Sequence, residues 1–413
     1  MEMLDLAALL LTLAAIFSYI NFRFIKLPTT IGIMLIAMLI SVSLVALGHF
    51  GFEGIQNKAT LVLRSIDFNK ALMHGMLSFL LFSGALHVNL EDLAMHKWII
   101  SILATFGVVM STFIVGSSAW IVFWIIGLKL PFIYCLLFGS LIAPTDPIAV
   151  IGILKKAGVT KSLETKITGE SLFNDGVAVV VFLVIMGIVT GGHDVTAGHI
   201  MLLFVEEAVG GVLFGLAIGW LAYLMLKSVD NYQVEVLITL ALVMGGYALA
   251  NAINISGPIA MVVAGIFIGN RGRLLAMSEN TREHLDSFWE LIDEILNAVL
   301  FLLIGLEILV LTIKGSYLIA GLIMIPVVLI ARFISVGLPV TFLRLLRDFS
   351  PHAVKIMTWG GLRGGISVAL ALSIPNGPER EALLTVTYII VIFSILVQGL
   401  TIERFVSSKK LTE

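Results

Sequence analysis

Long apolar segments recur along the whole chain, and they limit its fold more than any other feature. A helix needs about 20 mostly apolar residues to cross the hydrocarbon core of a bilayer. Only 13% of the 413 residues are charged and 59% are hydrophobic, whereas soluble domains carry roughly 25% charged residues. The sequence therefore predicts an all-α polytopic membrane protein with about 13 transmembrane helices. The thirteen segments are residues 4–22, 30–48, 69–88, 98–127, 132–154, 163–190, 199–226, 233–253, 257–270, 289–313, 316–343, 353–374 and 381–403.

Basic residues predict how these segments are oriented, because lysine and arginine concentrate in cytoplasmic loops. The loops after odd-numbered segments, together with the C-terminal tail, hold seventeen of the 25 lysines and arginines, and the opposite loops hold five. This bias predicts a multi-pass protein of the cell (inner) membrane, with its N-terminus outside and its C-terminus in the cytoplasm. A net charge of -2 without a basic block gives no reason to expect a nucleic-acid partner. The single cysteine, Cys135, excludes an internal disulfide and a cysteine-based metal site.

The fifth segment contains the stretch APTDPIAV, residues Ala143–Val150. Pro144 and Pro147 lack amide donors and disfavour helix in the residue before them, so the backbone around Asp146 is expected to be unwound. Unwound backbone at membrane depth is tolerated where it lines a cavity or is buried in protein. Its free carbonyls and the Asp146 carboxylate are then ligands for a cation. The alternative is a proline kink in which Asp146 only hydrogen-bonds to neighbouring helix ends.

The sixth segment places four polar residues on one broad helical face, since residues four apart lie above one another. They are Glu170, Ser171, Asn174 and Asp175. Two carboxylates this close in a low dielectric need a counter-charge or a proton. Arg332, the only charge within the eleventh segment, is the expected ion-pair partner of Glu170. The alternative for Glu170 is a position in the membrane interface.

The twelfth segment, TWGGLRGGISVALAL, is interrupted by four glycines around Arg363. This break lies seven segments after the proline break, and an odd spacing inverts the second half of the chain relative to the first. Interrupted helices in corresponding positions of inverted repeats are typical of the central site of transporters. Asp146 would face the positive N-terminal ends of the broken helices, and Arg363 would balance the negative C-terminal ends.

Three stretches together resemble the Na⁺/H⁺ antiporters of the NhaP type, prokaryotic relatives of the animal sodium/proton exchangers. They are Ala143–Val150, Gly169–Phe182 and Gly360–Leu372. The resemblance implies an NhaA-like antiporter fold with two crossing unwound helices, in a homodimer that works by an elevator-like movement. The implied parts are residues 1–97 and 191–315 for the dimer domain and its linker helix, residues 98–190 and 316–405 for the core domain, and residues 406–413 for a short cytoplasmic tail.

The resemblance also implies residue roles. Many relatives carry an acidic residue in the third segment, where this chain has Ser83. Apart from the resemblance, the polar residues Asp293, Glu294 and Asn297 of the tenth segment either line a cytoplasmic funnel or lie in the membrane interface. By this resemblance, Asp175 is the essential carboxylate that binds the cation or the proton, and Asp146, Thr145 and Ser171 are further ligands. Asn174 orients the site and is associated with electroneutral exchange. Glu170 and Arg332 form a stabilising ion pair, and Arg363 compensates charge at the crossing helices.

The predicted function is secondary active transport that exchanges Na⁺ or Li⁺ for H⁺, one for one, by alternating access at a midplane carboxylate. K⁺/H⁺ exchange is the main alternative, because the choice between Na⁺ and K⁺ depends on the fine geometry of the ligands, which a sequence does not show. A cation channel is less favoured, since channels usually take ligands from several chains. Scattered histidines without metal-ligand spacing argue against an enzyme, and no cofactor is expected. The expected partners are monovalent cations, protons, the bilayer and a second copy of the chain.

Overall fold

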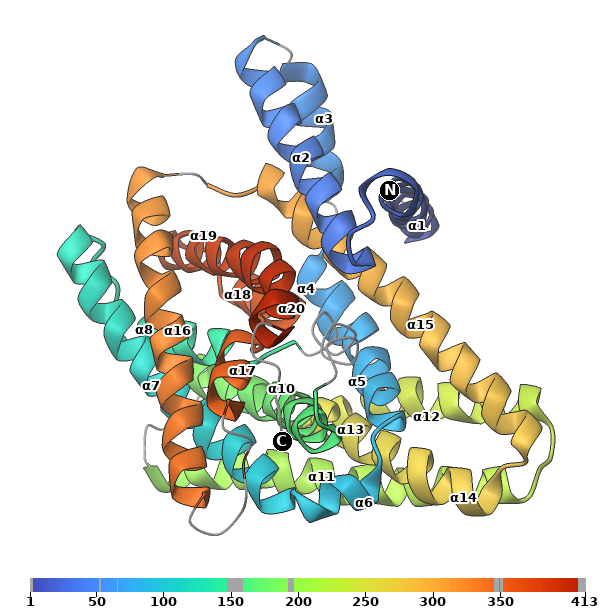
Figure 1. Cartoon of the computed structure of the whole chain (residues 1–413). Coiled ribbons are helices and arrows are strands. Elements are labelled where there is room, and N and C mark those ends of the chain that lie inside the picture. The colour runs from blue at the N-terminus through green and yellow to red at the C-terminus, as the bar shows by residue number, and fades with distance from the viewer. Residues whose placement is uncertain are drawn as a thin grey trace.

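The computed structural model describes residues 3–51, 53–64, 66–146, 159–191, 197–312, 314–344, 349 and 352–407. Every regular element within these ranges is helical (Figure 1). The α-helices are α1 (Met3–Ile20), α2 (Thr29–His49), α3 (Glu53–Arg64), α4 (Phe68–Lys70), α5 (Leu77–Leu86), α6 (Leu90–Met95), α7 (Lys97–Ile126), α8 (Phe132–Ile142), α10 (Lys161–Val189), α11 (Ala197–Lys227), α12 (Tyr232–Ala252), α13 (Gly257–Phe267), α14 (Arg273–Ala276), α15 (Glu279–Leu306), α16 (Gly315–Leu343), α17 (Ala353–Trp359), α18 (Gly365–Ser373), α19 (Pro378–Phe393) and α20 (Gly399–Ser407). Shorter π-helical or 3-10 turns are η1 (Asn21–Ile25), η2 (Ala71–Met76), η3 (Ile268–Gly272), η4 (Glu307–Leu309) and η5 (Ser394–Gln398).

Nine helices of the described ranges are long and apolar enough to cross a membrane. This result confirms the predicted all-helical, polytopic class, whereas the exact count of thirteen is not confirmed. The nine correspond to the first, second, fourth, sixth, seventh, eighth, ninth, eleventh and thirteenth predicted segments. They are Leu4–Ile25, Thr29–Gly48, Lys97–Ile126, Lys161–Val189, Val205–Lys227, Tyr232–Ala252, Gly257–Ala276, Gly315–Leu343 and Pro378–Glu403.

The other four predicted segments are interrupted or partly polar. The third is divided between α4, η2 and α5. The fifth is helical up to Ile142, at the end of α8, and not helical from Ala143 to Asp146; its residues 147–154 lie outside the described ranges. The tenth belongs to α15, which begins at Glu279, and its first half carries many charges. The twelfth is divided into α17 and α18 around the glycines at 360–365.

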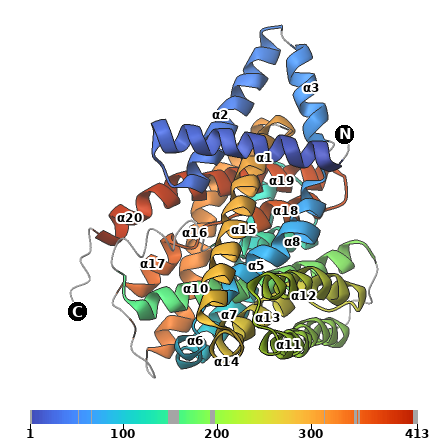
Figure 2. The same ribbon diagram turned by 90° about the vertical axis from the view of Figure 1, so that its right-hand side faces the viewer.

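The helices that surround the two interruptions pack closely together. Helix α7 lies along α8, α10 and α16, and α19 lies along α16 and α18. Helix α15 packs against α2, α5 and α12, and α13 packs against α5 and α11. Helices α2 and α3 extend beyond the rest of the described chain, as Figure 2 also shows. Helix α10 contacts α7, α8, α11 and α13, and the four polar residues of its polar face are buried.

Candidate functional site

The two interrupted helices meet at their breaks. The backbone after α8 is not helical from Ala143 to Asp146, and α18 begins only at Gly365. The Asp146 N–H donates to the carbonyl of Leu362 across 2.8 Å, which forms a short antiparallel bridge. Pro144 cannot donate such a bond, and glycines on the opposite side leave room for a close approach. Two segments about 220 residues apart in sequence are thus joined through their main chains.

Each break carries one charged side chain, and each of these side chains lies at a helix end whose dipole has the opposite sign. The Arg363 Nη1 donates to the carbonyls of Ala143 (2.7 Å) and Pro144 (2.9 Å), just beyond the last residue of α8. These carbonyls carry the negative end of the dipole of α8. The Asp146 carboxylate lies beside Gly364, where an added Cβ would come within 2.8 Å of the Asp146 Cβ. The carboxylate therefore lies at the positive N-terminal end of α18.

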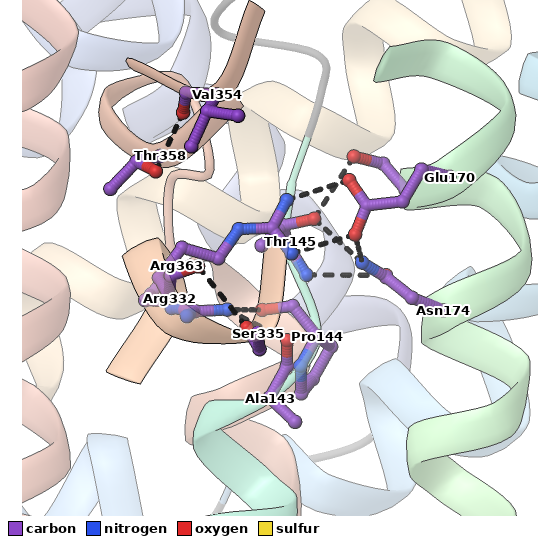
Figure 3. A network of polar contacts seen from close by, with 11 residues as sticks. Ala143, Pro144, Thr145, Glu170, Asn174, Arg332, Ser335, Val354, Thr358 and Arg363 are labelled. Carbon is purple, nitrogen blue, oxygen red and sulfur yellow. Dashed lines mark hydrogen bonds and ion pairs between the residues drawn. The ribbon is translucent and has the colours of Figure 1, made fainter. Parts of the chain in front are cut away.

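A buried ion pair connects α10 to α16. The Arg332 Nη1 donates to Glu170 Oε1 across 2.7 Å, and Nη2 donates to Oε2 across 2.6 Å (Figure 3). The side chains are only 7% and 1% exposed, respectively. This two-point geometry is the strong arrangement of a guanidinium and a carboxylate. It places Glu170 inside the protein instead of in the membrane interface.

Asn174 extends this network to the unwound segment. Its Nδ2 donates to Glu170 Oε1 (2.9 Å) and to Thr145 Oγ1 (2.7 Å), and its Oδ1 accepts from the Thr145 N–H (3.3 Å). The hydroxyls of Thr145 and Ser171 share a further hydrogen bond of 3.0 Å. Figure 3 shows the Asn174 side chain reaching between Glu170 and Thr145. The unwound backbone is thereby fixed against α10.

Asp175 differs from these residues because it takes no part in the network. The residue is buried, with 6% exposed, and its Oδ1 has no hydrogen-bond partner in the part of the chain that the structure describes. Asp175 and Asp146 line the same cavity of about 740 Å³. A buried polar atom without a partner costs free energy unless a bound species satisfies it. Two carboxylates beside neutral hydroxyl oxygens provide the hard oxygen ligands that small cations prefer.

The cavity connects the buried Asp175 and the partly buried Asp146 to the surface. Its lining includes Lys161 at the first turn of α10, whose side chain is 76% exposed and ion-paired with Asp92 at 2.7 Å. The wall from α5 includes Ser83, whose hydroxyl donates to the carbonyl of Trp289 across 3.0 Å. The wall from α15 includes Asp293. Access to the site in this conformation is thus from the side where α10 begins.

All eight residues singled out in the sequence lie in one neighbourhood. Asp293 and Asn297 also belong to the cavity, although their sequence pattern left two positions open for them. The spacing of four residues places both on one face of α15, and this was the signal that could have assigned them together. The eight residues are Thr145, Asp146, Glu170, Ser171, Asn174, Asp175, Arg332 and Arg363.

Comparisons with known proteins agree with this architecture. The family described as "Sodium/hydrogen exchanger, transmembrane" matches residues 9–408. The Na(+)/H(+) antiporter NhaP of Pseudomonas aeruginosa is 51% identical over 408 residues, which cover 98% of this chain and 96% of that protein. The Na(+)/H(+) antiporter NhaH of Halobacillus dabanensis is 33% identical, with 93% of this chain and 92% of that protein covered.

A solved structure shares the fold. The sodium proton antiporter MjNhaP1 from Methanocaldococcus jannaschii, at pH 8, superposes with a TM-score of 0.75 at 19% identity, and each chain is covered completely. The apolar helices of the described ranges and the family match together make the chain a multi-pass membrane transporter. It belongs to the sodium/hydrogen exchanger family.

Proposed function

We propose that this protein exchanges Na⁺ or Li⁺ for H⁺ across the membrane, one for one, at Asp175. The observation that carries the proposal is the buried Asp175 carboxylate, which has an oxygen without a partner and lies with Asp146 at the inner end of an open cavity. The names of the similar curated proteins support Na⁺ over K⁺ as the cation. No resident metal or cofactor is part of the proposal.

Competition at one carboxylate is sufficient to couple the two fluxes. Asp175 binds either a proton or a dehydrated cation, and Asp146, Thr145 and Ser171 provide further oxygens for the cation. The charge on Arg332 is permanent and already balanced by Glu170. Asn174 carries no titratable group, so exchanging one cation for one proton moves no net charge.

Alternating access requires that the same site opens to the other side. We propose that the group formed by α7, α8, α10 and α16–α20 moves relative to the remaining helices, in a homodimer that holds the remaining helices fixed. The bridge between Asp146 and Leu362 supports this division, because it makes the two broken helices move together. In the predicted orientation, α10 begins on the same side of the membrane as the C-terminus, which is the cytoplasm. The cavity opens on that side, so in this conformation it opens to the cytoplasm.

The test is a transport assay in proteoliposomes. A pH gradient is imposed, Na⁺, Li⁺ or K⁺ is added in turn, and a pH-sensitive dye follows the gradient with the membrane potential clamped at several values. We expect Na⁺ and Li⁺ to collapse the gradient at a rate that does not depend on the potential. If only K⁺ collapsed the gradient, the transported cation would be K⁺ and not Na⁺ or Li⁺. A rate that depends on the membrane potential would reject the one-for-one ratio. No response to any cation would overturn the function.

The first variant to test is Asp175→Asn, which preserves the shape of the side chain and removes its charge. We expect exchange to fall to the background of empty liposomes, while the protein keeps its elution volume and its melting temperature. Glu206→Gln is the matched control, because this exposed carboxylate of α11 does not line the cavity. Its exchange rate is expected to equal that of the wild type. Substantial exchange by Asp175→Asn would remove Asp175 from the mechanism.

A further inference from the structure

One face of α15 forms a continuous wall of the cavity. Glu290, Asp293, Asn297 and Leu300 all line it, and their spacing of three or four residues places them on one helical stripe. Glu290 is exposed at the outer end. Leu300 lies at the inner end, where an added Cβ on Gly365 would contact its side chain at the start of α18. Asp293 and Asn297 therefore lie on the path between the mouth and the broken helices, with Asp293 about 10 Å from Leu300 along the helix axis.

Two neutral oxygens of residues that line this cavity are buried and have no partner among the described residues. Asn297 is 2% exposed; its Nδ2 donates to Asp293 Oδ2 across 3.0 Å, and its Oδ1 accepts no hydrogen bond. Ser367, on α18, is 1% exposed, lines the same cavity and has a hydroxyl without a partner. Buried oxygens of this kind cost free energy until something binds them. A cation satisfies an amide oxygen and a hydroxyl oxygen together.

The charge of the cavity selects the sign of the ligand. The described lining includes one lysine, which is paired with Asp92, and one histidine, His87. A cleft lined mainly by one sign of charge concentrates the opposite counter-ion. The carboxylates that line it are Asp92, Asp146, Glu164, Asp175, Glu290 and Asp293.

We propose that Asp293, Asn297 and Ser367 form a second cation-binding station, which holds a monovalent cation before it reaches Asp175. The inference rests on the proposed function, and it adds a second site that is separate from the central site at Asp175 and Asp146. A carboxylate with an amide and a hydroxyl oxygen is a hard-ligand set suited to Na⁺ or Li⁺. Because the station offers one carboxylate, whereas Asp175 and Asp146 together offer two, it holds the cation less tightly and passes it inward.

The kinetic test uses Asp293→Asn in the proteoliposome assay. We expect the KM for Na⁺ to rise by roughly tenfold, the lower range for charge focusing in a cleft, with the maximal rate nearly unchanged. This split indicates a lost binding step ahead of the exchange itself. Asp293→Glu is expected to restore the KM. The matched control is Glu294→Gln, the next residue of α15, which is exposed and does not line the cavity; its KM should equal that of the wild type.

An equilibrium test separates the station from the central site. In the Asp175→Asn protein, Na⁺ at constant ionic strength is expected to raise the melting temperature relative to N-methylglucamine. Adding Asp293→Asn to that protein should abolish the rise. If Asp293→Asn does not fold, Ser367→Ala and Asn297→Ala take its place, and each is expected to raise the KM by a smaller factor.

The outcomes distinguish the two proposals. A wild-type protein without cation-dependent collapse of the gradient overturns the function and the station together. A wild-type protein that exchanges Na⁺ while Asp293→Asn keeps its KM overturns the station alone. An equal Na⁺-dependent rise in the melting temperature with and without Asp293 would also overturn it.

Discussion

Arg332 is a buried, permanently charged residue of the site. Its guanidinium cannot lose its proton under any ordinary condition, and it is buried against Glu170 with two short hydrogen bonds. Gly361 makes room for it, because an added Cβ there would lie 2.8 Å from the Arg332 Nε. Removing two ions from water is costly, and their mutual attraction offsets that cost only when both are present. The ion pair therefore stabilises the site only while both Arg332 and Glu170 are present.

Replacing Arg332 alone is predicted to destabilise the protein. Arg332→Gln leaves the Glu170 carboxylate buried without its counter-charge, a change that costs about 3–5 kcal/mol in other proteins. The measurement is thermal unfolding followed with a fluorogenic thiol dye, since the buried Cys135 becomes reactive only on unfolding. The double variant Glu170→Gln, Arg332→Gln should recover part of the loss. A melting temperature of Arg332→Gln equal to that of the wild type would contradict this account.

Helices α8 and α18 show what local sequence rules can predict about an element. Two prolines and four glycines predicted where these helices are interrupted, because those residues act on the backbone within one turn. The hydrogen bond between Asp146 and Leu362 could not be predicted in the same way. It depends on how two distant segments pack, and that packing is set by the surrounding helices. The positions of Asp293 and Asn297 could not be predicted for the same reason, because a polar stripe on α15 is compatible both with a cavity wall and with the headgroup region of the membrane.

The close packing of α7 on α8 is predicted to depend on Gly139. An added methyl group there would overlap the Thr112 carbonyl oxygen, which is backbone and has no rotamer to adopt. Gly139→Ala should therefore lower the stability by about 1–3 kcal/mol, as overpacked interiors do. Gly245→Ala on α12 is the control, because nothing lies within 4 Å of its added Cβ. The comparison is made by thiol-dye melting, and equal melting temperatures for the two variants would contradict the prediction.

For the whole molecule, the sequence predicted the class, the nine spans found in the described ranges, and eight polar residues that the structure brings together. The apolar segments and the motifs at Pro144, Asp175 and Arg363 were sufficient, because burial in a bilayer restricts where polar residues can occur. The exact number of spans did not follow, since α15 combines a charged half with an apolar half and is not one uniform segment. The domain boundaries and the roles of the site residues stay predictions.

Exchange by the whole molecule is predicted to depend on pH through competition at one site. Lowering the pH protonates Asp175 more often, so more Na⁺ is needed and the KM for Na⁺ should rise. Raising the pH makes protons scarce on the return step, so the maximal rate should fall. The rate at fixed, subsaturating Na⁺ is then bell-shaped against pH. Measuring rates over a grid of Na⁺ concentrations and pH values checks this; a KM for Na⁺ independent of pH would exclude competition at one carboxylate.

The cavity has one more consequence, which concerns the electric field across the bilayer. The cavity of about 740 Å³ is open to one side and is lined by Asp175 and Asp146, so it is wide enough for the solution of that side to reach both carboxylates. Those carboxylates therefore lie close to the electrical potential of that solution, and the voltage drop is concentrated in the protein beyond them. Any unbalanced charge that moves with the site would cross nearly the whole drop, at about 2.3 kcal/mol per 100 mV. In the proposed movement of the helices around the site, the pairing of Arg332 with Glu170 and the neutral side chain of Asn174 would avoid that electrical work.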